Sequence, residues 1–172
     1  DGIFDCTIEP VMDAWGFTTQ NYRVPSADEL QQMLTHVDYK QVQQNGSDVS
    51  IPADVQVDLG GIAKGYTSDR IMQVLADDGV TSGIVSLGGN VQALGCKPDG
   101  SKWRVAVQDP NDEGENFAVV EIADEAVITS GGYQRYFEDN GRTYHHIIDP
   151  RTGTPADSGI ISSTIISHDG TL

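Results

Sequence analysis

The residues best suited to chemistry lie in one stretch, YHHIIDPRTGTP, which runs from Tyr144 to Pro155. It combines two imidazoles, a carboxylate, a guanidinium and hydroxyl groups next to a rigid turn. Histidine is the side chain that exchanges protons most readily near neutral pH, so His145 and His146 are candidate general bases. Adjacent residues on a strand face opposite sides, so only one of them can point into a site. The alternative is an ordinary hairpin exit in which Asp149 starts a turn.

Three glycine-rich segments follow apparent strands elsewhere in the chain. Glycine lets a ligand approach the backbone, and a helix N-terminus offers N–H groups with partial positive charge, which suits a pyrophosphate. None of the segments is a GxGxxG or Walker sequence, and each alone could simply be a tight turn. Together they favour a ligand cleft lined by backbone. The segments are DLGGIAKGY at 58–66, GGN at 88–90 and SGG at 130–132.

The elements that must position these residues form an α+β pattern of mostly antiparallel strands with a few packed helices. We expect a short helix after Pro10 that ends at Gly16, a helix after the capping box that starts at Ser26, and a helix that ends at Gly79. The inward face of this last helix is expected to include Ala63, Thr67, Ile71, Val74 and Leu75. Strands are expected at 39–43, 48–51, 55–59, 82–87, 91–94, 103–107, 117–122, 125–129 and 159–166, and Asn140-Gly141 is expected to turn a hairpin.

Length and charge limit the class of protein. A chain of 172 residues is expected to form one domain, residues 1–172. The formal net charge of −16 argues against nucleic acid as the main partner, because little positive charge is present to neutralise a phosphate backbone. Cys6 and Cys96 fit neither a zinc site nor a redox motif. No apolar run approaches the ~20 residues that a membrane span needs, and no signal peptide is visible.

Five segments in this order resemble the ApbE family, the FAD:protein FMN transferases: IFDCTIEPVMDAWGF, DLGGIAKGY, SLGGN, ITSGGYQRYF and HHIIDPRTGTP. The resemblance covers essentially the whole chain and implies a T-fold-like domain. It implies an enzyme that uses Mg²⁺ to transfer FMN from FAD to a Thr or Ser hydroxyl of a target protein, releasing AMP. Two alternatives stay open: an Mg²⁺-dependent FAD pyrophosphatase that gives FMN and AMP, and a non-catalytic flavin-binding or flavin-trafficking protein.

The resemblance also assigns residues by position. It makes His146 the catalytic base, leaves His145 as a bystander, and makes the backbone carbonyl of Ala63 a metal ligand. The remaining positions are expected to contact FAD or to line its pocket: Ile3, Phe4, Asp5, Gly60, Tyr66, Gly89, Asn90, Ser130 and Gly131.

The chain also departs from the family pattern. Family members have an upstream segment whose aromatic residue packs on the flavin, and a later Asp-rich helix that completes the metal site. Neither is found in this sequence, so the chain is expected to be an ApbE domain truncated at both ends, and Asp169 is not expected to be the metal ligand. Family members are commonly lipid-anchored at the outer face of the cytoplasmic membrane, so a periplasmic or extracytoplasmic location is expected.

Overall fold

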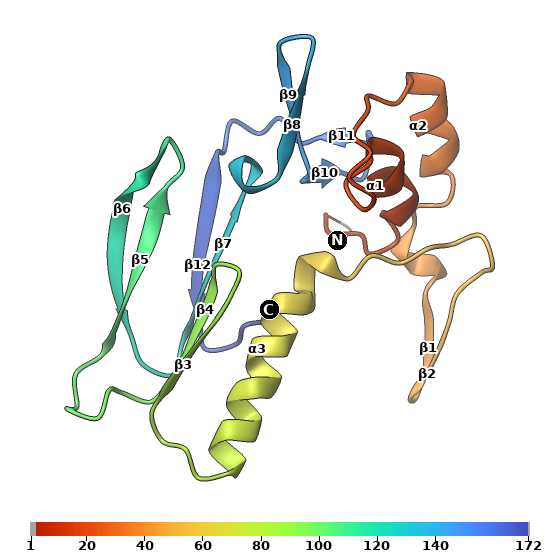
Figure 1. The fold of residues 1–172 in the computed structure, drawn as a ribbon. Helices are drawn as coiled ribbons and strands as arrows, with labels where there is room; N and C mark the ends of the chain where they lie inside the picture. The colour runs from red at the N-terminus through yellow and green to blue at the C-terminus, as the bar shows by residue number, and fades with distance from the viewer. Residues whose placement is uncertain (1–2, 172) are drawn as a thin grey trace. The chain divides into compact units, whose positions relative to one another are not determined.

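The computed structural model describes residues 3–171, so both ends of the expected domain lie outside the described residues. The chain divides into two compact units, each assembled from two separate segments. The first unit contains Asp1–Leu59 and Gly132–Gly159, and the second contains Gly60–Gly131 and Ile160–Leu172. The expectation of a single domain stays a prediction. Figure 1 shows the elements of both units along the chain.

The first unit combines two short helices with three two-stranded antiparallel ribbons, which pair β1 with β2, β8 with β9 and β10 with β11. Its elements are α1 (Glu9–Trp15), α2 (Ala27–Leu34), the 3₁₀ turn η1 (Tyr39–Gln41), β1 (Gln43–Asn45), β2 (Asp48–Ser50), the 3₁₀ turn η2 (Gly132–Gln134), β8 (Tyr136–Asp139), β9 (Arg142–His145), β10 (Ile148–Asp149) and β11 (Thr154–Pro155).

Local sequence explains where the two helices begin and end. Helix α1 has a proline in its first turn and ends at Gly16, whose φ of 80° gives the left-handed cap that glycine adopts without strain. Helix α2 begins after Ser26, whose hydroxyl accepts a hydrogen bond of 3.2 Å from the N–H of Glu29. Both predicted helices and their caps are therefore confirmed.

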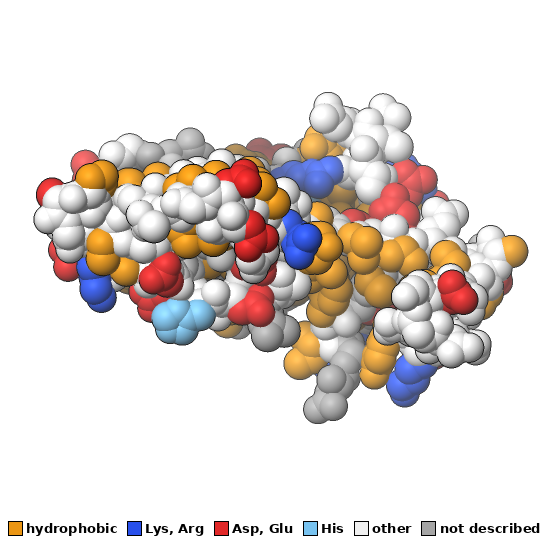
Figure 2. Space-filling model, turned by 90° about the horizontal axis from the view of Figure 1, so that it is seen from below, with side chains coloured by type: hydrophobic (Ala, Val, Ile, Leu, Met, Phe, Trp, Pro, Cys, Tyr) orange, Lys and Arg blue, Asp and Glu red, His pale blue; other side chains and the backbone are white. Residues whose placement is uncertain are grey.

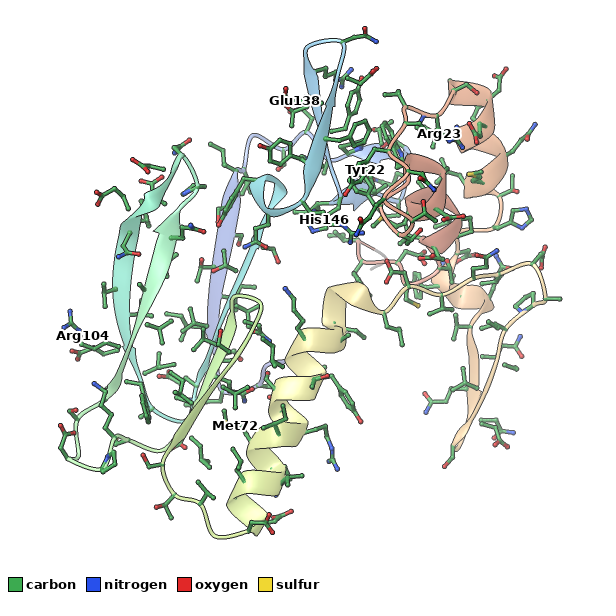
Figure 3. All side chains as sticks on the ribbon, in the orientation of Figure 1. Tyr22, Arg23, Met72, Arg104, Glu138 and His146 are labelled. Carbon is green, nitrogen blue, oxygen red and sulfur yellow. The ribbon has the colours of Figure 1, made fainter. Side chains whose placement is uncertain are left out.

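Aromatic side chains form much of the core of the first unit. Trp15 and Phe17, at the end of α1, are almost completely buried. Phe137 from β8 and Tyr144 from β9 pack on them, and their rings stack at 5.3 Å. Tyr22, labelled in Figure 3, stacks on the ring of Phe137 at 5.1 Å. Ring packing thereby fixes the β8–β9 hairpin to α1.

The second unit is a four-stranded antiparallel sheet in the order β12-β7-β4-β3, with one long helix and one hairpin (Figure 1). Apolar residues of the β5–β6 hairpin form a buried core with Ala93 of β4 and Val127 of β7. Its elements are α3 (Gly60–Asp77), β3 (Gly83–Leu87), β4 (Asn90–Leu94), β5 (Trp103–Asp109), β6 (Asp112–Ile122), β7 (Ala126–Gly131) and β12 (Ser162–Ser167).

Helix α3 packs on β4 and β3, and its buried residues are Gly65, Ser68 and Met72. Gly65 lies against the backbone of Gly170 near the end of the chain. Met72 is labelled on this helix in Figure 3. The predicted inward face was wrong in part: Ala63, Thr67 and Val74 are exposed, whereas Ile71 and Leu75 are partly buried. The physical reason is that the contact face contains a glycine and a serine, which allow close approach but do not register as an apolar stripe.

Two strand predictions also fail. Residues 55–59 form no strand, and the N–H of Asp58 instead donates to the carbonyl of Cys6 at 2.8 Å. Residues 39–41 form the turn η1, stabilised by the carboxylate of Asp38, which accepts from the N–H of Lys40. The α+β class with antiparallel sheets is confirmed. Among the described residues, no helix combines the length and apolarity that crossing a membrane requires.

Candidate functional site

His146 lies directly after β9 in the first unit, and one carbonyl orients it. Its backbone N–H donates to the carbonyl oxygen of Arg135 at 3.2 Å, and its ring Nδ1 lies 3.1 Å from the same oxygen. A carbonyl oxygen can only accept, so Nδ1 carries the proton and Nε2 carries the lone pair of the neutral ring. The edge of the ring meets Phe17, with the centroids 6.3 Å apart. The ring therefore has the tautomer that a base acting through Nε2 needs.

His145 has the opposite tautomer. Its Nε2 lies 3.1 Å from the carbonyl oxygen of Ala156, and its Nδ1 accepts from the N–H of Ile147 at 3.3 Å. Both ring nitrogens thus bond to backbone groups, one just after β11 and one just before β10. The ring also packs against Gly132, where an added Cβ would lie 2.8 Å from a ring carbon. This arrangement suits a structural side chain.

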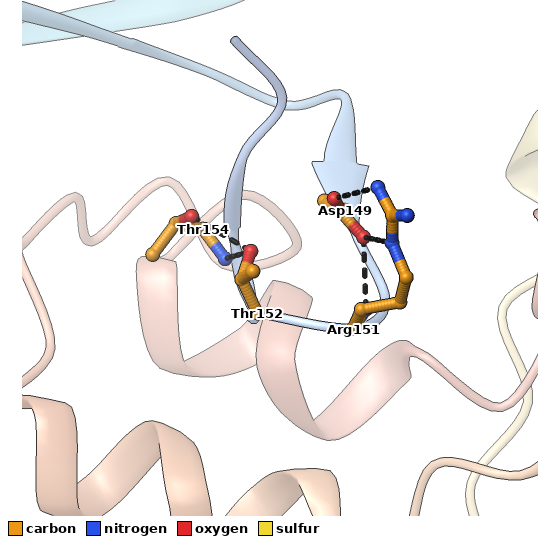
Figure 4. A network of polar contacts seen from close by, with 4 residues as sticks. All are labelled: Asp149, Arg151, Thr152 and Thr154. Carbon is orange, nitrogen blue, oxygen red and sulfur yellow. Dashed lines mark hydrogen bonds and ion pairs between the residues drawn. The ribbon is translucent and has the colours of Figure 1, made fainter.

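The turn after His146 is held by its own polar side chains, shown in Figure 4. The Asp149 carboxylate accepts from the backbone N–H of Arg151 and from its guanidinium at 2.9 and 2.6 Å. These hydrogen bonds lower the pKa of Asp149 to about 2. Trp15 donates from its indole N–H to the carbonyl of Gly153 at 2.7 Å. Asp149 therefore stabilises the turn, and Trp15 ties the turn to the core.

The three candidates near the N-terminus differ in how far they are exposed to solvent. Ile3 and Phe4 are 89% and 53% exposed. Asp5 is buried, and both of its oxygens accept hydrogen bonds: Oδ1 from the N–H and hydroxyl of Thr7, and Oδ2 from the N–H of Tyr39. The Asp5 carboxylate thus organises this segment, and Ile3 and Phe4 present apolar surface that a ligand could cover.

In the second unit, the start of α3 meets the turn between β3 and β4. Gly60 begins the helix, and Ala63 and Tyr66 are exposed within its first two turns. The ammonium group of Lys64 donates to the carbonyl of Gly88 at 3.3 Å, which connects the two segments. Lys64 was not among the predicted site residues, although it lies inside the segment that carried the prediction.

The other glycine-rich exits lie at one end of the sheet. Asn90, the first residue of β4, is opposite Ile128 of β7, so the β3–β4 turn lies at the end of the sheet where β7 finishes. Ser130 and Gly131 are the last residues of β7 and pair with Ser163 and Ser162 of β12. Gly89, with a φ of 88°, forms the turn. The structure thus brings these four candidates to the same edge of the second unit.

The sequence did not lead us to predict a layer of buried polar side chains between α3 and β4. The side-chain amide of Asn90 donates to the hydroxyl of Ser68 at 3.4 Å, and that of Gln92 donates to Asp69 at 2.9 Å. Asn90 is 2% exposed, so it acts within this layer. Burial opposes ionisation of Asp69, but hydrogen bonds from Thr171 and its neighbours outweigh this and lower its pKa. The sequence offered one signal for this layer: Asn90 and Gln92 are two apart on one strand, so their side chains lie on the same face of the sheet.

The described residues do not fit a complete magnesium site. Within residues 3–171, no group of three or more His, Cys, Asp or Glu side chains could hold a metal ion. On the face shown in Figure 2, acidic side chains are scattered rather than gathered. Mg²⁺ prefers several oxygen ligands in octahedral geometry, whereas the sequence predicts a single ligand from this chain, the backbone carbonyl of Ala63.

The predicted residues fall into two sets. His146, Ile3, Phe4 and Asp5 belong to the first unit, and the others belong to the second. The carbonyl of Arg135 is the clearest example of a contributing group that the sequence did not indicate.

Comparison with known proteins shows what the chain resembles. Two curated relatives are named FAD:protein FMN transferase. That of Treponema pallidum is 38% identical over 96% of this chain and 51% of the relative. That of Escherichia coli K12 is 34% identical over 97% of this chain and 50% of the relative. The chain therefore spans about half the length of these relatives.

Solved structures share the fold. The ApbE protein of Thermotoga maritima is 41% identical, with a TM-score of 0.91 over 99% of this chain and 56% of that chain. The apo form of the flavinyl transferase ApbE of Pseudomonas stutzeri is 35% identical, with a TM-score of 0.85 over 99% of this chain and 54% of that chain. The sequence also matches the ApbE family over residues 1–172. The chain belongs to the ApbE family.

Proposed function

We propose that the protein to which this chain belongs transfers FMN from FAD to a Thr or Ser hydroxyl of a target protein. The names of its relatives support the reaction class. The observation that carries the proposal is the hydrogen bond of 3.1 Å between Nδ1 of His146 and the carbonyl of Arg135. It leaves the lone pair on Nε2, where a general base needs it.

In the proposed reaction, Nε2 of His146 takes the proton of the acceptor hydroxyl. The oxygen then attacks the phosphorus on the FMN side of the FAD pyrophosphate. The new P–O bond joins FMN to the acceptor, the pyrophosphate P–O bond breaks, and AMP leaves. The carbonyl of Arg135 accepts from Nδ1–H before and after the transfer, so it also stabilises the imidazolium that forms.

The second unit would bind the nucleotide. The first turn of α3 carries no acidic residue, and its partial positive charge favours phosphate. Gly60, Tyr66, Gly89, Ser130 and Gly131 would line that pocket. Dependence on Mg²⁺ is also part of the proposal, supported by the family resemblance, with Ala63 as the ligand from this chain.

Mass spectrometry tests the reaction. The full-length protein is mixed with FAD, Mg²⁺ and a peptide that carries an acceptor Thr. A peptide that gains the mass of FMN supports transfer. Release of AMP and free FMN without that gain indicates a pyrophosphatase, and FAD binding without either product indicates a flavin-binding protein. A parallel reaction with excess EDTA tests the metal dependence.

The His146→Ala variant tests the base. Removal of a positioned general base is expected to lower the transfer rate by about 10²–10⁴-fold, while the Kd for FAD stays close to that of the unchanged protein. His36→Ala is the matched control, because His36 is a partly exposed histidine that contacts Asp54 at 3.2 Å. Transfer by His146→Ala at the rate of the control would place the base elsewhere.

We further propose an extracytoplasmic, lipid-anchored location for the full-length protein. The support for this location is the family resemblance. Fractionation of cells that express the full-length protein tests it, and recovery in the cytoplasmic fraction would contradict it.

A further inference from the structure

The segment that carries His146 is closed by a ring of hydrogen bonds that runs through the side chain of His145. The Nε2–H of His145 donates to the carbonyl of Ala156 at 3.1 Å. The N–H of Ala156 donates to the carbonyl of Ile147 at 2.9 Å, and the N–H of Ile147 donates back to Nδ1 of His145 at 3.3 Å. The residues on both sides of His146 are thereby held to each other and to Ala156, which follows β11.

His146 itself depends on this framework. Its backbone N–H and its Nδ1 both point at the carbonyl oxygen of Arg135. A rotation of the peptide before His146 would move both donors away from that oxygen together. The ring could then present either nitrogen to solvent, and the lone pair would no longer be confined to Nε2. The side chain that opposes this rotation is that of His145.

Gly132 makes room for the His145 ring. A Cβ at position 132 would lie 2.8 Å from Cδ2 and 2.9 Å from Cγ of His145, which is closer than carbon atoms approach in proteins. The ring is therefore clamped between η2 on one side and its two backbone partners on the other. This tight fit gives a second way to disturb His145 without removing it.

We propose that His145 is a positioning residue that holds His146 in the Nδ1–H tautomer, with Nε2 as the proton acceptor. Its meaning for catalysis rests on the proposed FMN transfer. The tautomer that each ring adopts, and the contacts that set it, do not depend on that function. The test therefore separates the two.

Two-bond ¹H–¹⁵N spectra of the full-length protein, labelled with ¹⁵N-histidine, read the tautomers directly. Spectra are recorded at about pH 8.5, where an ordinary histidine is neutral. We expect His146 to be protonated on Nδ1 and His145 on Nε2. In His145→Ala, and in Gly132→Ala, the His146 signals should shift to a mixture of tautomers. A His146 protonated on Nε2 in the unchanged protein, or unchanged signals in both variants, would overturn the proposal.

Kinetics give the second readout. His145→Ala should lower kcat for FMN transfer by about 10- to 100-fold and change KM for FAD less than about twofold, because the nucleotide contacts stay intact. His145→Gln keeps a donor for the carbonyl of Ala156 and should recover part of kcat. His36→Ala is again the control. A rise in KM at constant kcat would assign His145 to substrate binding and sink the idea.

The two proposals fail in different ways. If the unchanged protein transfers no FMN, the proposed function is wrong, and the tautomers still decide the role of His145. If transfer is normal but His145→Ala is as fast as the control, the positioning role is wrong and the function stands. If His145→Ala does not fold, His145→Gln and Gly132→Ala supply the same comparison.

Discussion

Gly65 is expected to be the least replaceable residue of α3. A Cβ at this position would lie 1.8 Å from the carbonyl oxygen of Gly170 and 2.7 Å from its carbonyl carbon. Both are backbone atoms, so no side-chain rotation can relieve the overlap. Gly170 is in turn held by its N–H, which donates to Asp69 at 2.9 Å. Thr171 donates its hydroxyl to the same carboxylate.

In Gly65→Ala, the segment at Gly170 must move away from α3, and both hydrogen bonds to Asp69 are lost. Hydrogen bonds to a charged group contribute about 1.5–3 kcal/mol each, and the low end applies because Asp69 is partly exposed. Alanine is favoured over glycine inside a helix by about 1 kcal/mol, which offsets part of the loss. The free energy of unfolding should therefore fall by about 2 kcal/mol.

Urea unfolding and amide hydrogen exchange measure this change in the full-length protein. We expect a lower midpoint and loss of protection at the amides of Gly170 and Thr171 first. Gly83→Ala is the matched control, since a Cβ there meets one side-chain carbon of Leu75 at 3.9 Å, an ordinary contact. If Gly65→Ala unfolds at the midpoint of the control and keeps its protection, the close approach of the two backbones is not as described.

Three further predictions concern the first unit. Trp15→Phe keeps an aromatic ring but leaves the buried carbonyl of Gly153 without its donor, so thermal unfolding should show a loss of about 1–3 kcal/mol. The pKa of Asp149 is lowered to about 2 by Arg151, so its contribution is complete above about pH 4 and is lost as pH falls towards 2. Denaturation curves of the unchanged protein and Asp149→Asn should converge over that range, and a constant gap would contradict the ion pair. Asn140 has a φ of 50°, so Asn140→Ala should cost about 1 kcal/mol in urea unfolding, whereas equal midpoints for Asn140→Ala and Asn140→Gly would count against strain there.

The fold class and many local elements could be predicted because their signals lie within a few residues. The Ser26 cap and the Gly16 helix end depend on adjacent backbone groups. Asn140-Gly141 marks the β8–β9 hairpin through its positive φ angles. The prediction of a strand at 55–59 was wrong because the alternating pattern suits a strand, whereas the backbone N–H of Asp58 bonds to the carbonyl of Cys6, far away in the sequence.

The candidate site was predictable in residue type and less so in role. The sequence singles out His145 and His146 equally, and only the family resemblance chose between them. The structure supplies a physical difference, since both nitrogens of His145 bond to nearby backbone and Nδ1 of His146 bonds to a carbonyl from another segment. Asp149 carries a reactive group, but Arg151 engages both of its oxygens.

The sequence by itself determined the α+β class, the glycine-rich strand exits and the reactive stretch from Tyr144 to Pro155, because each of these depends on residues that are close together in the sequence. The tertiary structure decided which nitrogen of His146 keeps its lone pair. That choice depends on the carbonyl of Arg135, eleven residues away, which a local pattern does not encode. It also decided the buried side of α3, because Gly65 faces the backbone of Gly170 and Ser68 faces Asn90 of β4, and both allow close approach rather than adding hydrophobic surface.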